Sequence, residues 1–138
     1  MASNVTARAV ILNDQGQMLI VRRSSTDPLH PGTWDIPGGR VEHGEDIKMA
    51  AVRETQEEVG LALLEPVLLF ATSDMRGDVS KSWLFYKSNL DPENGEVQLG
   101  DEHDEYKWIR PSELNQYTDY DILLRFQDYA LKNGLLPA

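Results

Sequence analysis

The sequence predicts an α/β or α+β domain in which a sheet lies between helices. Extended apolar segments and two helical patterns alternate along the chain, an order typical of this fold class. No repeat, low-complexity tract or linker interrupts them. A chain of 138 residues can bury one core but hardly two, so we expect a single domain over residues 1–138.

The expected elements follow from local composition and spacing. In chain order they are strands at 5–12 and 18–21, a loop at 24–33, a short extended piece at 34–36, a helix at 46–59, strands at 66–73, 81–88 and 105–110, and a helix at 122–133. Asp46 is a good N-cap for the first helix, and Gly60 a natural stop. The glycine and charges at 74–80 indicate a hairpin loop.

The net charge of −10 argues against several classes of function. Most of such a surface would repel a polyanion, and no Lys/Arg cluster marks a groove for one, so we expect no nucleic acid polymer as a partner. No apolar run approaches the roughly 18 residues that a membrane span requires. A small anionic substrate stays compatible with this charge if a metal ion supplies positive charge locally.

The chain contains no cysteine and shows no secretory signal at its N-terminus. The lack of cysteine excludes disulfides and thiolate metal sites and fits a reducing compartment. We therefore expect a cytoplasmic protein without a membrane partner. Its oligomeric state stays open.

Three glutamates of the first predicted helix share one face. Glu54, Glu57 and Glu58 have the i, i+3, i+4 spacing of neighbours on a helix surface. Thr55 and Val59 fall on a roughly opposite face that can pack on a sheet. Three clustered carboxylates repel one another, and a hard divalent cation would remove that repulsion. The alternative is an ordinary solvent-facing helix rich in glutamate.

Two neighbouring features favour a site over a solvated face. Arg53 lies one turn before Glu57 and can hold it through an i, i+4 ion pair. Ahead of the helix, Gly38-Gly39 permits a tight turn in which backbone groups approach a ligand or a metal.

The spacing of the whole segment is more specific than the glutamates alone. Five, seven, two and one residues separate Gly39, Glu45, Arg53-Glu54, Glu57-Glu58 and Gly60. The segment GRVEHGEDIKMAAVRETQEEVGL resembles the Nudix box at every fixed position. One position departs mildly, because the family prefers an aliphatic residue where this chain has Thr55.

This resemblance implies a fold, a reaction and a set of site residues. The fold is a mixed sheet sandwiched between helices, and the reaction uses water and Mg²⁺ or Mn²⁺ to split a nucleoside diphosphate linked to another group. The implied metal ligands are Glu54, Glu57 and Glu58, together with the Gly39 carbonyl and Glu102 from the acidic 101–105 loop ahead of Trp108. Glu45 and Arg53 would support the helix and its carboxylates. The general base stays open among Glu54, Glu57 and Glu102.

Four further residues are candidates for substrate binding. Arg22 and Arg23 end the second strand and can contact phosphates, with surface arginines as the alternative. We also expect Asp35 to contact the substrate. Asp121 precedes the last helix, where MutT-like relatives place a base-contacting residue, with a helix cap or first-turn role as the alternative.

The remaining aromatic and histidine residues are less informative. Trp34, Trp83 and Phe85 belong to the core or to a pocket wall. The three histidines lack ligand spacing and are expected in loops or at the surface.

The leading hypothesis is a MutT-like enzyme that hydrolyses a nucleoside triphosphate, ordinary or oxidised, to a monophosphate and pyrophosphate. An ADP-ribose or other nucleotide-sugar pyrophosphatase is a second possibility. A Nudix module that has lost catalysis and senses a ligand is a third, disfavoured because no box carboxylate is missing.

Overall fold

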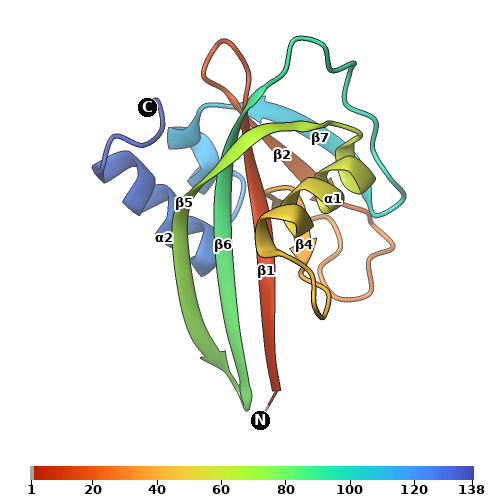
Figure 1. The fold of residues 1–138 in the computed structure, drawn as a ribbon, viewed down its shortest axis with the longest axis vertical. Helices are drawn as coiled ribbons and strands as arrows, with labels where there is room; N and C mark the ends of the chain where they lie inside the picture. The colour runs from red at the N-terminus through yellow and green to blue at the C-terminus, as the bar shows by residue number, and fades with distance from the viewer. Residues whose placement is uncertain (1) are drawn as a thin grey trace.

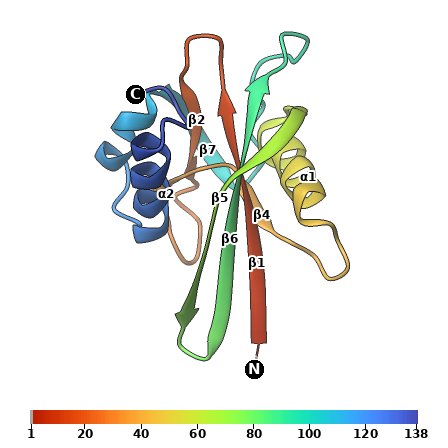
Figure 2. The ribbon, with the colours of Figure 1, turned by 60° about the vertical axis from the view of Figure 1, so that its left-hand side comes forward.

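A seven-stranded sheet separates the two α-helices, with α1 (Ile47–Val59) on one side and α2 (Asp121–Lys132) on the other (Figures 1 and 2). The computed structural model describes residues 2–138, so Met1 of the expected domain lies outside the described residues. The other elements are β1 (Ala2–Leu12), β2 (Met18–Arg23), β3 (Trp34–Asp35), β4 (Gly38–Arg40), β5 (Leu63–Arg76), β6 (Val79–Leu90), β7 (His103–Ile109) and the 3-10 helix η1 (Pro111–Gln116). The expected sheet between helices is confirmed.

The sheet is mixed and is built around β1. This strand runs parallel to β6 along its whole length, from Ala2 beside Val79 to Leu12 beside Asn89, whereas every other strand pair is antiparallel. β1 meets β2 only at Leu12 and Met18, after which β4 takes the same edge of β1. The sheet therefore splits between β1 and β2.

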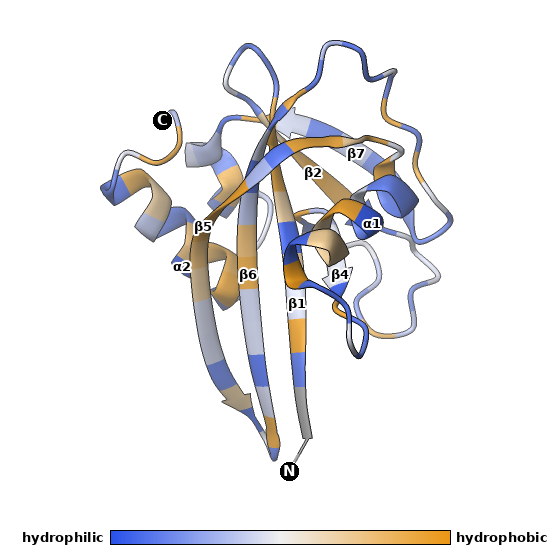
Figure 3. Cartoon of the chain, in the orientation of Figure 1, coloured by the Kyte–Doolittle hydropathy of each residue, from blue (hydrophilic) through white to orange (hydrophobic). Residues whose placement is uncertain are grey.

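Both faces of β1 are buried over residues 7–12, which explains the apolar run from Ala9 to Leu12. Ala9 and Ile11 pack toward the end of α1, while Val10 and Leu12 join the cluster beneath α2. In that second cluster the rings of Phe85 and Phe126 stack with centroids 4.5 Å apart. Figure 3 shows hydrophobic residues in the middle of β1 and β6, between the two helices, and also on β5, where Leu64, Val67 and Leu68 are exposed.

Helix α1 begins and ends as its sequence predicts. The Asp46 side chain accepts a hydrogen bond from the Met49 N–H at 3.1 Å, and Gly60 adopts the left-handed conformation, with φ of 70°. Thr55 and Val59 are fully buried against the sheet, as expected. None of the helices within residues 2–138 is both long and apolar enough to cross a membrane.

Two local expectations were wrong, and one element was not predicted. The loop expected at 74–80 shrinks to a turn at Gly77 and Asp78, because β5 and β6 pair as far as Arg76 and Val79. The sequence around Gly38 forms β4 rather than a free turn, since β1 offers it a strand edge. The 3-10 helix η1 was not foreseen, and the Glu113 side chain closes its first turn onto the Arg110 N–H at 2.8 Å.

Candidate active site

The three glutamates of α1 share a face, but their burial differs widely. Glu57 keeps 58% of its side chain exposed and Glu54 keeps 17%. Glu58 is buried, and its carboxylate accepts a hydrogen bond from the Gly38 N–H at 2.9 Å. The expectation that all three side chains face away from the sheet is therefore wrong for Glu58. It lies one turn beyond the buried Thr55 and so shares part of the packed face.

Strand β4 presses two glycines against the helix and β1. Gly38 has φ of 147°, and a Cβ there would collide with the backbone of Ala7 and Arg8. A Cβ at Gly39 would collide with the Glu54 carboxylate. The glycine pair thus allows close approach on both sides, and it brings the Gly39 backbone directly beside Glu54.

Arg53 ties the start of the helix to the carboxylates. Its Nε and Nη2 donate to the two Glu45 carboxylate oxygens at 2.8 and 3.0 Å. Its Nη1 donates to Glu54 at 3.1 Å and to Glu57 at 3.3 Å, while Nη2 also donates to the Arg40 carbonyl at 3.2 Å. The bidentate bond from Arg53 is the main reason why the pKa of Glu45 falls to about 2.

Burial makes the negative charge of this cluster costly. Loss of solvent raises the pKa of Glu58 to about 8, against the opposing effects of the Gly38 N–H and of Arg8. Burial also raises the pKa of Glu54, although Arg53 lies beside it. A cation bound among these carboxylates would relieve both costs.

The acidic loop at 101–105 and the glutamates of α1 line one cavity. A cavity of about 300 Å³, the acidic cavity, is lined by Glu54, Glu57, Glu58, Gly100, Asp101, Glu102 and His103. Oxygen donors of this kind fit magnesium or manganese. Within residues 2–138, no three Asp, Glu or His side chains already form a metal cage.

His103 differs from the surface histidine that we expected. It begins β7, is only 7% exposed, and lines the acidic cavity. Its Nδ1 finds no hydrogen-bond partner among the described residues, and burial lowers its pKa. An isolated histidine in an acidic, polar segment carries no sequence signal for this burial.

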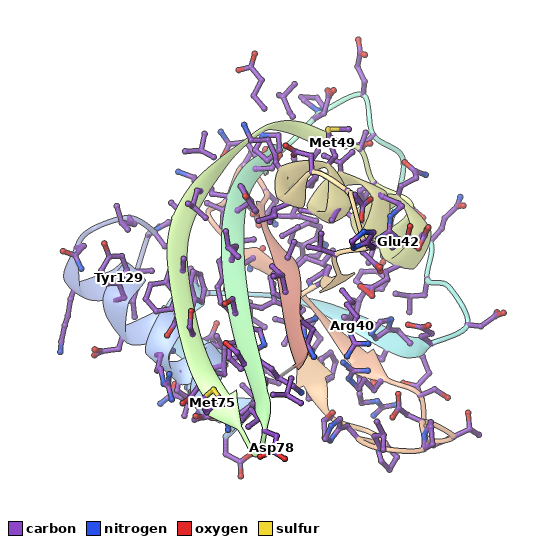
Figure 4. All side chains as sticks on the ribbon, turned by 60° about the horizontal axis from the view of Figure 1, so that its bottom comes forward. Arg40, Glu42, Met49, Met75, Asp78 and Tyr129 are labelled. Carbon is purple, nitrogen blue, oxygen red and sulfur yellow. The ribbon has the colours of Figure 1, made fainter. Side chains whose placement is uncertain are left out.

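A basic wall lies beside the acidic cavity. A neighbouring cavity of about 310 Å³ joins Glu54, Glu58 and Glu102 to Arg8 and Arg23. Arg40 of β4 also lines it, and Figure 4 shows Arg40 on the segment that leads to Glu42 and α1. Arg8 was not among the site residues predicted from the sequence. The only signal was an arginine at a buried position of an apolar strand, where a charge needs a partner.

Asp35 is the partner of both arginines. It accepts from Arg8 at 3.2 Å and from Arg23 at 3.3 Å, and it is buried. These three residues also line a third cavity of about 410 Å³ on the α2 side of the sheet. Arg8 and Arg23 therefore stand between the acidic cavity and this one.

The third cavity, which we call the aromatic cavity, combines aromatic and cationic side chains. Besides Arg8, Arg23 and Asp35, its lining consists of His30, Thr33, Trp34, Arg76, Lys81, Trp83, Thr118, Asp119 and Tyr120. Trp34 and Trp83 are thus wall residues, and Trp83 also belongs to the buried core, as Phe85 does. The guanidinium of Arg76 lies 5.4 Å from the Trp83 ring centroid.

Two candidate residues lie outside this arrangement. Arg22 pairs with Asp104 at 2.9 Å and with Glu105 at 3.2 Å, and it lines none of the three cavities. Asp121 is the first residue of α2 and does not line the aromatic cavity. Its carboxylate instead accepts from Arg76 at 3.0 Å and from Arg125 at 3.1 Å.

Comparison with known proteins identifies the class of this site. Residues 2–126 match the family model of the NUDIX domain, so the chain belongs to the Nudix family and is a Nudix hydrolase. Hydrolases of this family generally use a divalent metal.

A curated relative agrees with this assignment, and solved structures share the fold. The chain is 30% identical over 116 residues to the nucleoside triphosphatase NudI of Escherichia coli K12, covering 78% of this chain and 82% of that protein. Its fold matches the MutT protein of Methanosarcina mazei with a TM-score of 0.81, at 24% identity and 96% coverage of both chains. It also matches the NUDIX domain of Shewanella oneidensis NrtR in complex with ADP ribose, with a TM-score of 0.75, 21% identity, and coverage of 96% of this chain and 89% of that one.

Proposed function

We propose that the protein is a nucleoside triphosphate pyrophosphohydrolase, which releases a nucleoside monophosphate and pyrophosphate. The observation that carries the proposal is that the three cavities lie side by side. Arg8 and Arg23 stand next to the glutamates of the acidic cavity, and the same two arginines line the aromatic cavity. A triphosphate spans such an arrangement with its base among the aromatic residues and its phosphates beside the arginines. The likeness to NudI, a nucleoside triphosphatase, supports the same substrate class.

The acidic cavity is suited to a divalent cation. Glu54, Glu57, Glu58 and Glu102 would hold it, with the Gly39 carbonyl as a further ligand. Such an ion supplies charge neutralisation at the phosphate oxygens and a more acidic bound water. The fit rests on oxygen donors that face one cavity and on the raised pKa values of Glu54 and Glu58.

The chain's own residues orient the reaction. Arg53 holds the carboxylates of Glu54 and Glu57 in place through Nη1. Arg8 and Arg23, fixed by Asp35, present guanidinium groups to the phosphates. A carboxylate that faces the acidic cavity accepts the proton of the attacking water, and Glu54, Glu57 and Glu102 are the candidates. The pH–rate profiles of the three Gln variants identify which of them acts as the base.

A nucleotide-sugar pyrophosphatase is the second candidate. The observation that favours it is the shared fold of the NrtR domain, which binds ADP ribose. The aromatic cavity, at about 410 Å³, is within the usual size range for small-ligand sites and does not separate the two substrates. A ligand sensor without catalysis is disfavoured because every box glutamate is present.

One substrate screen tests these alternatives. Purified protein is incubated with Mg²⁺ or Mn²⁺ and with ordinary and oxidised nucleoside triphosphates, ADP-ribose and dinucleoside polyphosphates, and the phosphate products are separated. The proposal expects pyrophosphate and a nucleoside monophosphate, and no turnover in EDTA. Preference for ADP-ribose would favour the second candidate. Full turnover after exhaustive EDTA treatment would overturn the metal mechanism.

A further inference from the structure

The segment between β6 and β7 is fastened to the end of α1. We call residues 94–100 the strap, since they cross from the turn after β6 to the acidic loop. The Asn94 side chain forms two hydrogen bonds with the Ala62 backbone, each of 3.0 Å. The Gln98 N–H donates to the Val59 carbonyl at 2.9 Å, and the Gly100 N–H donates to the Glu58 carbonyl at 3.0 Å.

These bonds satisfy part of the helix terminus. The last carbonyls of an α-helix have no partner within the helix and need one elsewhere. Here the strap supplies donors to two consecutive residues of the final turn, one of them Glu58. Val97 and Leu99 add apolar contacts with the cluster that contains Val59 and Leu61. The strap is therefore attached by both backbone bonds and side-chain packing.

Gly100 is a residue of the strap that lies against the backbone of α1. A Cβ on this residue would lie 3.0 Å from the Glu57 carbonyl oxygen, tighter than almost all ordinary contacts. A side chain at this position therefore requires the strap or the end of the helix to shift by a few tenths of an ångström. Gly95, in the same strap, faces open space instead, because a Cβ on it would have no neighbour within 4 Å. This position therefore tolerates a methyl group freely.

The far end of the strap leads directly to Glu102. Gly100, Asp101 and Glu102 line the acidic cavity with Glu57 and the other helix glutamates. We propose that the strap sets the position of Glu102 relative to the α1 glutamates, with Gly100 and Asn94 as positioning residues. This inference rests on the role of Glu102 in the proposed function. One anchor of the strap is the backbone of Glu58. A shift of the helix end therefore moves Glu102, and a shift of Glu102 moves the helix end.

The matched pair Gly100→Ala and Gly95→Ala tests the proposal. Gly100→Ala should lower kcat about ten-fold with little change in KM, because a small misplacement of a reacting group lowers the rate steeply. It should also weaken Mn²⁺ binding, measured by electron paramagnetic resonance in the absence of substrate. Gly95→Ala should leave both quantities at the wild-type level. Equal behaviour of the two variants would overturn the proposal.

A double-mutant cycle with Glu102→Gln separates positioning from general damage. If the strap acts through Glu102, then Gly100→Ala should cost little further activity in the Glu102→Gln background. Full additivity would contradict that route. Asn94→Ala allows the same cycle, because it removes two hydrogen bonds of the strap without adding a bulky group. It tests the proposal if Gly100→Ala does not fold.

The cycle also distinguishes the strap proposal from the proposed function on which it rests. If Glu102→Gln retains the wild-type kcat, the assignment of Glu102 in the proposed function falls, and the strap proposal falls with it. If Glu102→Gln is slow while Asn94→Ala and Gly100→Ala match Gly95→Ala, only the strap proposal falls.

Discussion

The acidic cavity and the aromatic cavity are assembled in opposite ways. The five carboxylates of the first come from one stretch of α1 and one loop, and their spacing is visible in the sequence. The second gathers residues from β1, β2, β3 and the loop before it, the β5–β6 hairpin and the loop between η1 and α2, which only the tertiary fold brings together. The residues proposed for catalysis are thus encoded locally, whereas those proposed to recognise the substrate are brought together only by the topology.

The two cavities also differ in the charge of the side chains that line them. The acidic cavity concentrates carboxylates, whereas four of the residues that line the aromatic cavity are arginine or lysine, in a chain with net charge −10. A substrate with both a metal-binding polyphosphate and a hydrogen-bonding base needs both kinds of surface. Substitutions in the acidic cavity should therefore lower the rate of hydrolysis, whereas substitutions in the aromatic cavity should weaken the selectivity between substrates.

The largest effect should come from the helix glutamates. Glu57→Gln and Glu58→Gln should each lower kcat on the order of a hundred-fold or more, because a lost charged ligand misplaces the metal. Glu58→Gln keeps an oxygen for the Gly38 N–H, so the fold should survive. Steady-state kinetics and circular dichroism check this, with the exposed Glu93→Gln as control. Near-normal rates in both variants would make the box vestigial and favour a ligand sensor.

A smaller loss should follow from Glu102→Gln. Its side chain is exposed and comes from a loop rather than from the helix, so we expect a fall in kcat of about ten-fold, at the low end of the range for general acid–base catalysis. A shifted acidic limb of the pH–rate profile would identify it as the base. An unchanged rate and profile would return the 101–105 loop to the role of a solvated turn.

For the aromatic cavity, Asp121 offers a test of selectivity. Asp121→Ala removes one of the two carboxylates that hold Arg76 and Arg125, the other being Asp74, so the Arg76 guanidinium of the aromatic cavity is held less firmly. We expect a higher KM and discrimination between bases weakened by roughly 1–3 kcal/mol, with metal dependence intact. Relative kcat/KM values for several nucleotides measure this. Asp128→Ala, which breaks the Lys132 pair on the same helix, is the matched control. Loss of stability with unaltered selectivity would exclude Asp121 from recognition.

A separate prediction concerns the pH dependence of stability rather than activity. The pKa of Glu58 is raised from 4.5 to about 8 in the fold, so the folded state keeps a proton that the unfolded chain releases. In metal-free protein the free energy of unfolding from this group should therefore fall as pH rises from about 4.5 to about 8. Glu58→Gln should flatten that slope in urea titrations. A wild-type slope in the variant would contradict the burial argument.

The sequence predicted what local chemistry determines. Asp46 and Gly60 marked the ends of α1 because capping depends on neighbouring residues alone. The inward turn of Glu58 was missed, since it depends on the N–H of Gly38 and therefore on the pairing of β4 with β1. Arg8 was missed for a similar reason, as its partner Asp35 lies 27 positions away on another strand.

The parallel pairing of β1 with β6 has a consequence for how the molecule folds. Each residue of β1 pairs with one 77 positions further along the chain, as Ala2 does with Val79. Closing so long a loop costs entropy before any contact compensates it, and such pairings slow folding. Helix α1 and the β5–β6 hairpin involve only near neighbours and can form first. Because β1 carries Arg8 and the edge that receives β4, we expect a refolding chain to form α1 before the candidate site is assembled.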